Sequence, residues 1–138
     1  MEKVYRVGGW ITLLLSIASL LYVYAGVEHS FYLYIDGNLI SINKHNFFYA
    51  GLIFIAITNL IYFLGLYRLQ IDEKVKGWLS LGLPLINLSI LIVFFIIKSI
   101  HESNQLSISY LKLFIFLILG FFAFWAFRLI YMIIKKQK

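Results

Sequence analysis

The sequence contains no cysteine and a single proline, and charged residues occupy 13% of its 138 positions. Without cysteine the chain has no disulfide, thiolate ligand or thiol nucleophile, which excludes thiol redox catalysis, thioether attachment of haem and cysteine-held iron–sulfur clusters. Soluble domains carry charge at roughly 25% of their positions, so a chain this poor in charge cannot cover a soluble surface with polar groups. A soluble enzyme is therefore excluded.

Apolar residues make up 62% of the chain and gather in four long runs. A helix that crosses a bilayer needs about 20 mostly apolar residues. The runs are Trp10–Val27, Phe47–Tyr67, Trp78–Ile97 and Leu113–Ile134. With their flanking turns they predict an all-α membrane protein: four transmembrane helices over about 7–27, 46–67, 77–98 and 110–134, packed as one bundle in a single domain 1–138.

The first run has a competing interpretation as a cleaved signal peptide, because Lys3 and Arg6 precede it. The apolar core of a signal peptide is usually ~7–15 residues long and ends at a small-residue cleavage site. This run is longer, and its one candidate site lies around residues 24–26. We therefore expect the first run to be retained as a span.

Lysine and arginine are distributed unevenly between the two sides of the spans, and this bias orients a membrane protein. The side of the first and third connections holds Lys44, Lys98 and Lys112. The side of the termini and the second connection holds Lys3, Arg6, Arg68, Lys74, Lys76, Arg128, Lys135, Lys136 and Lys138. The bias predicts an integral, multi-pass protein of the cytoplasmic (inner) membrane with both termini cytoplasmic. It also accounts for most of the net charge of +6, so no nucleic-acid partner is expected.

An offset of 68 positions aligns two parts of the chain. Residues 6–13 (RVGGWITL) match residues 74–81 (KVKGWLSL), and Lys44 matches Lys112. Matches at glycine, tryptophan and lysine are harder to attribute to apolar low complexity than matches at leucine. Two interpretations stay open: chance similarity, and a duplicated helical hairpin (1–68 and 69–138) with a pseudo-two-fold axis along the membrane normal.

The first outer loop predicts a short β-hairpin. Two β-branched and aromatic segments, 31–35 (FYLYI) and 39–42 (LISI), flank Asp36-Gly37-Asn38, and Asp-Gly between such segments is a strong hairpin signal. The alternative is that 31–35 extends the first helix and only the Asp-Gly-Asn segment turns. A lone hairpin is marginal in water, so the bundle, headgroups or a partner must brace it. Candidate helix N-caps are Asn43 or Ser41 for the second span, and Ser107 or Ser109 for the fourth.

We single out one polar residue inside each span, at similar depth: Ser19, Asn59, Asn87 and Arg128. At ~1.5 Å per residue they lie between about 9 and 15 Å from the same side, so they could converge inside the bundle. Pro84, one turn before Asn87, predicts a bend that frees backbone groups nearby. Two interpretations stay open: interhelical hydrogen bonds with a snorkelling arginine, or a polar site for a lipid headgroup, quinone or anionic ligand.

Three histidines lie on the outer side: His29, His45 and His101. Imidazole suits zinc and haem iron, but the spacing matches no compact metal motif, so we expect neither metal nor cofactor. No Asp or Glu lies within a span, which argues against proton-coupled antiport by this chain alone. The spans also lack a Ser/His/Asp or metal constellation for hydrolysis, so we do not expect an enzyme.

Very apolar spans and short loops predict a non-catalytic structural or assembly subunit of a larger cytoplasmic-membrane complex, such as a respiratory, secretory, motor or transport machine. Trp125 lies mid-span in a phenylalanine-rich helix, so we expect it to find an interhelical hydrogen bond or to face another subunit. The alternative is a small protein that binds or transports a lipid, quinone or other amphipathic ligand. Expected partners are membrane lipids and other integral membrane subunits. Ile, Phe, Tyr, Lys and Asn are abundant and Ala is scarce, as in proteins from AT-rich genomes, which favours a bacterial source.

Overall fold

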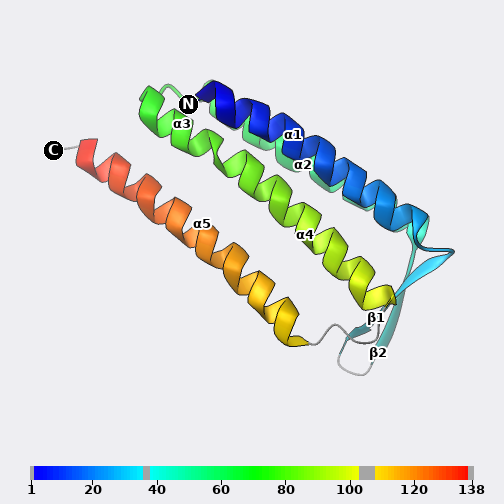
Figure 1. The fold of residues 1–138 in the computed structure, drawn as a ribbon. Coiled ribbons are helices and arrows are strands. Elements are labelled where there is room, and N and C mark those ends of the chain that lie inside the picture. Colours follow the sequence, from blue (N-terminus) through cyan, green and yellow to red (C-terminus); the bar gives the residue numbers. More distant parts are fainter. Residues whose placement is uncertain (1, 36–37, 103–107, 137–138) are drawn as a thin grey trace.

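The computed structural model of this chain describes residues 2–35, 38–102 and 108–136, and most of them are helical (Figure 1). In chain order its elements are α1 (Glu2–Ala25), β1 (Ser30–Ile35), β2 (Asn38–Asn43), α2 (Lys44–Arg68), α3 (Glu73–Ser80), α4 (Gly82–Glu102) and α5 (Ile108–Lys136). Among the described residues, four segments are long and apolar enough to cross a membrane: Lys3–Ala25, Lys44–Leu66, Glu73–His101 and Lys112–Lys135. The four predicted spans are thus confirmed as helices of spanning length, α3 and α4 together forming the third.

The long helices run side by side, with both termini at one end of the bundle and the two strands at the other (Figure 1). We call these the terminal end and the hairpin end. Helix α1 packs most extensively on α4 and also contacts α2 and α3, whereas α5 packs on α3 and α4. Helix α4 therefore lies between α5 and the α1–α2 pair.

The predicted hairpin is confirmed, because β1 and β2 pair antiparallel from Ser30 opposite Asn43 to Ile35 opposite Asn38. The alternative, in which 31–35 extends the first helix, is wrong. The Asp36-Gly37 segment, predicted to turn, lies outside the described residues, as does the candidate cap Ser107. Helix α2 begins directly after β2, where the Asn43 side chain accepts a 2.8 Å hydrogen bond from the His45 backbone N–H, which confirms Asn43 as its cap.

The bundle braces the hairpin through an apolar core at the hairpin end. Phe31 of β1 is 0% exposed, and its ring centroid lies 4.4 Å from that of Phe47 in α2 and 5.5 Å from that of His101 in α4. The buried members of this core are Leu20, Val23, Val27, Phe31, Ile55, Ile90 and Phe94. A buried aromatic ring is among the larger contributors to apolar packing, so Phe31 anchors the strands to the helices.

The third span is interrupted at Leu81, where the sequence predicted one helix over about 77–98. Pro84 explains the interruption, because it has no backbone N–H to donate to Ser80 and its ring crowds that carbonyl. The helical segment also begins earlier than predicted, at Glu73. Asp72 caps it, because its side chain accepts a hydrogen bond from the Lys74 backbone N–H at 3.4 Å.

Two aromatic side chains donate to backbone carbonyls beside this interruption. Trp125 Nε1 of α5 donates to the Trp78 carbonyl at 2.9 Å, and the Tyr62 hydroxyl of α2 donates to the Leu79 carbonyl. Trp78 Nε1 donates in return to the Trp125 carbonyl at 3.0 Å. Trp125 therefore has the interhelical partner that its mid-span position required, and the two tryptophans attach α5 to α3.

Candidate functional site

The polar centre of the bundle is a reciprocal pair of asparagine amides. Asn59 Nδ2 of α2 donates to Asn87 Oδ1 of α4 at 2.8 Å, and Asn87 Nδ2 donates to Asn59 Oδ1 at 3.0 Å. Asn87 is 0% exposed, and Asn59 is half-buried and also donates to the carbonyl of Ile55 at 2.8 Å. Two of the four predicted polar residues thus lie together, and their amides join α2 to α4.

Helix α1 contributes a stripe of small polar residues to the same centre. The Ser16 hydroxyl donates to the Asn87 carbonyl at 2.8 Å, and Asn87 Nδ2 approaches both the Gly9 carbonyl and Thr12 Oγ1 at 3.4 Å. The backbones come close because Gly9 has no side chain, and a Cβ there would lie 3.0 Å from Leu83 Cδ2. Small and hydroxyl residues at helical spacing are typical of tight interhelical contacts in membranes. That spacing was the available signal for Thr12 and Ser16, which the sequence analysis did not single out.

The other two predicted residues do not contact the asparagine pair. Ser19 is buried on α1, where its hydroxyl donates to the Ser16 carbonyl at 2.7 Å within the same helix. Arg128 is exposed on α5, and its guanidinium carbon lies 5.1 Å from the centroid of the Trp78 ring, which is a cation–π geometry. Arg128 also lines an open cleft of about 490 Å³ between α3 and α5, together with Asp72 and Lys135.

The polar centre is a closed hydrogen-bond network. Within the described part of the chain, every buried side-chain nitrogen or oxygen has a hydrogen-bond partner. A reciprocal amide pair has no ionisable group and uses its best-placed donors and acceptors internally. The role of this centre is therefore structural: its hydrogen bonds fix α1, α2 and α4 in one register, and the amide pair carries no group that could transfer a proton.

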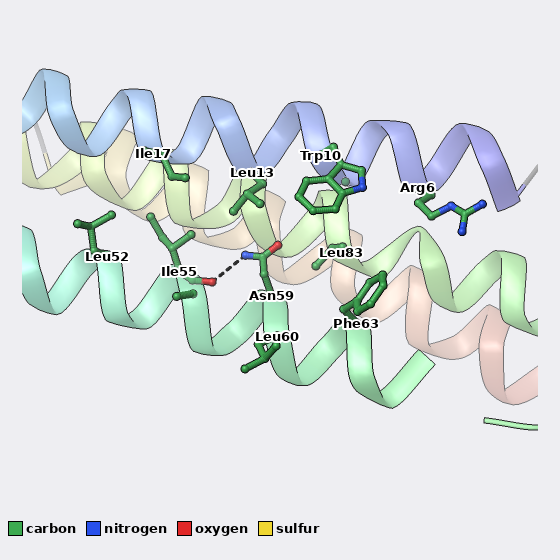
Figure 2. A pocket seen from close by; sticks show the side chains of 12 residues that line it. Arg6, Trp10, Leu13, Ile17, Leu52, Ile55, Asn59, Leu60, Phe63 and Leu83 are labelled. Carbon is green, nitrogen blue, oxygen red and sulfur yellow. Dashed lines mark hydrogen bonds between the residues drawn. The ribbon is translucent and has the colours of Figure 1, made fainter. Parts of the chain in front are cut away.

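Beside this network, a groove of about 360 Å³ runs between α1 and α2 (Figure 2). Its walls are Gly9, Trp10, Leu13 and Ile17 of α1, then Leu52, Ile55, Ala56, Asn59, Leu60 and Phe63 of α2, with Leu83 of α4 and with Arg6 at the terminal end. Figure 2 shows the Asn59 amide pointing between the two helices, with Arg6 lying at one end of the row of lining side chains. The volume lies within the ~300–1,000 Å³ that is usual for small-molecule sites, which are mostly apolar with a few placed polar groups.

The histidines lie at the hairpin end, where His45 and His101 take part through their side chains and His29 through its backbone carbonyl. His101 Nδ1 accepts a hydrogen bond from the Tyr32 backbone N–H at 3.2 Å, and His45 Nδ1 lies 3.0 Å from the Tyr24 hydroxyl. The His29 carbonyl accepts a 3.1 Å hydrogen bond from the Lys44 backbone N–H, at the junction of β2 and α2. Across the residues that the structure covers, no three His, Asp or Glu side chains gather as a metal site would require.

Comparison with protein-family models, with curated proteins and with solved structures found no match to this chain. Among the described residues, the groove between α1 and α2 has the volume and the mostly apolar lining that are usual for small-molecule sites.

Proposed function

We propose that this chain is a non-catalytic membrane protein that binds the hydrocarbon chain of an amphipathic lipid between α1 and α2. The observation that carries the proposal is the groove itself, which is apolar along its walls and basic at Arg6, at its terminal end. An occupant must match that order, with an apolar chain along the helices and a polar head at the terminal end. Membrane lipids have this amphipathic structure, with a hydrocarbon chain attached to a polar head.

The length of the groove supports a lipid chain. Along α1 the lining runs from Arg6 to Ile17, and along α2 from Leu52 to Phe63. At ~1.5 Å per residue each stretch measures about 16 Å, close to the ~15 Å that one leaflet contributes to a hydrocarbon core of ~30 Å. One lipid chain entering at the terminal end would reach the middle of the bundle and end beside the buried core.

Native mass spectrometry of the detergent-purified protein with added phospholipid tests this function. Ala56→Phe places a ring in the groove, whereas Ala18→Phe adds the same ring to an exposed position of α1 that does not line it. We expect the wild type and Ala18→Phe to retain one phospholipid, and Ala56→Phe to lower retention about tenfold, because the chain loses its apolar contacts. Equal retention by all three proteins would exclude the groove as the binding site.

A second candidate function, assembly with another integral membrane subunit, is favoured by the surface of α5. Its half-buried face includes Ile118, Phe122, Trp125, Leu129 and Met132, whereas the opposite face repeats Phe116, Gly120, Ala123 and Phe127 at exposed positions. Phe116 and Phe127 are 70% and 75% exposed, and a Cβ on Gly120 would touch nothing within 4 Å. The spacing of i, i+4, i+7 and i+11 is that of a helix-packing seam, and small residues let helix backbones approach in membranes.

Gly120→Leu tests this second function, with Gly65→Leu as its control because Gly65 is equally open on α2. We expect a stoichiometric companion to co-purify in mild detergent with the wild type and Gly65→Leu, but not with Gly120→Leu. Purification of a monodisperse isolated bundle would contradict assembly. Purification of a dimer of this chain would show that the partner is a second copy and not a different subunit.

A further inference from the structure

A second, more polar cavity opens where the groove meets the terminal end. It measures about 160 Å³ and is lined by Tyr5, Arg6, Phe63, Leu66, Lys76, Ser80 and Leu83. Arg6, Phe63 and Leu83 line both this cavity and the groove. The two cavities therefore adjoin, and the polar one lies at the end from which a lipid chain would enter.

The charge at this cavity comes from two helices that pack on each other. Arg6 belongs to α1 and Lys76 to α3, and no acidic residue lines either cavity within the described part of the chain. Guanidinium offers a planar fork of donors that fits phosphate, and the lysine ammonium adds a compact positive charge. The Ser80 hydroxyl already donates to the Lys76 carbonyl at 2.9 Å, so anion recognition rests on the two cations.

We propose that the Arg6–Lys76 cavity binds the phosphate of an anionic phospholipid whose acyl chain occupies the α1/α2 groove. The inference rests on the proposed lipid-binding function and specifies that the headgroup of the bound lipid is anionic. A zwitterionic head would bring its own cation to a cavity that already holds two, whereas an anionic head leaves the phosphate unopposed. A soluble anion would leave the adjoining apolar groove unfilled.

The cleft between α3 and α5 provides a matched control. It also holds basic residues at the terminal end, namely Lys74, Arg128 and Lys135, but Asp72 lines it and it does not join the groove. Arg128→Gln therefore removes one positive charge from the same end of the molecule without altering the proposed head site.

The test measures binding of phosphatidylglycerol and phosphatidylcholine to the intact protein in detergent micelles by native mass spectrometry. Glycerol 3-phosphate, which has the phosphate but no chain, distinguishes a lipid from a free phosphate. We expect phosphatidylglycerol to bind at least fivefold more tightly than phosphatidylcholine, and glycerol 3-phosphate not to compete at millimolar concentration. Arg6→Gln and Lys76→Gln should each weaken phosphatidylglycerol binding about fivefold, equivalent to ~1 kcal/mol per charge, and lower the ratio of phosphatidylglycerol to phosphatidylcholine affinity. Arg128→Gln should match the wild type.

The outcomes distinguish failure of the anionic head site from failure of the proposed lipid-chain site. Loss of both lipids in Ala56→Phe, with equal binding of the two lipids to the wild type, would retain the chain site and overturn the anionic head site. Selective phosphatidylglycerol binding that survives Ala56→Phe would overturn the chain site while Arg6 and Lys76 remain a headgroup site. A fall in Arg128→Gln equal to that in Arg6→Gln would show a general surface attraction and overturn the head site. Competition by glycerol 3-phosphate would show that the cavity binds a free phosphate and would overturn an anionic phospholipid as its ligand.

Discussion

Replacing Asn87 by leucine tests whether the asparagine pair holds the bundle together. Leucine has the same branched skeleton of side-chain heavy atoms as asparagine, with larger methyl groups at its ends, so the change removes polar contacts without opening a cavity. It deletes the two reciprocal amide hydrogen bonds, of 2.8 and 3.0 Å, and leaves Asn59 Oδ1 without its donor. Asn59 Nδ2 keeps its bond to the Ile55 carbonyl, so the orphaned group is the amide oxygen.

The magnitude follows from two terms. Interhelical hydrogen bonds in membranes contribute on average ~0.6 and at most ~1.7 kcal/mol each, so the pair supplies about 1–3 kcal/mol. An unsatisfied buried polar group costs a further ~1–3 kcal/mol, at the lower end here because Asn59 is half-buried. We therefore expect Asn87→Leu to lower the free energy of unfolding by about 2–4 kcal/mol. The double variant with Asn59→Leu should cost less than the sum of the two single changes, because it leaves no orphaned amide.

The assay is reversible unfolding by SDS from mixed micelles, followed by tryptophan fluorescence. Asn46→Leu is the matched control, because Asn46 is exposed near the start of α2, and we expect its effect to stay within ~0.5 kcal/mol. A cycle in which the two asparagine substitutions add without coupling would refute the pair as an energetic unit. So would an Asn87→Leu protein as stable as the control.

Three further changes test other parts of the fold. Gly82→Ala should loosen the packing of α5 and lower the free energy of unfolding by ~1–3 kcal/mol in the same titration, because its Cβ would lie 2.7 Å from a carbon of the Trp125 ring and against the Tyr62 hydroxyl. Gly120→Ala is the control and should leave the free energy of unfolding unchanged, because a Cβ there touches nothing within 4 Å. Phe31→Ala should cost ~3–5 kcal/mol and expose the hairpin to limited proteolysis, since the ring is 0% exposed, and unchanged proteolysis would contradict its anchoring role. For orientation, cysteines introduced at positions 38 and 103 should react with an impermeant thiol reagent from outside and one at position 73 should not, whereas the reverse labelling would overturn the charge argument.

Local features of the sequence were sufficient to predict the helices and the hairpin. Apolar run length defined four segments long enough to span a bilayer, and Asp36-Gly37 between β-forming segments indicated the hairpin. The Asn43 cap could also be predicted from the sequence, because capping depends on residues that are adjacent in the chain. Pro84 indicated a bend, but the sequence did not place the interruption at Leu81 or show which side chains would meet the backbone there.

Tertiary structure alone decided which polar residues meet. Every span is apolar on nearly all sides, so no amphipathic stripe fixes its rotation about its own axis. Side-chain depth could therefore place Ser19, Asn59, Asn87 and Arg128 at similar levels but not on facing surfaces. The close approach of α1 and α4 at Gly9 brought Thr12 and Ser16 to Asn87, while α5 carried Arg128 to Trp78. The groove beside Asn59 arises in the same way, because a cavity is set by the packing of three helices and has no counterpart in any one of them.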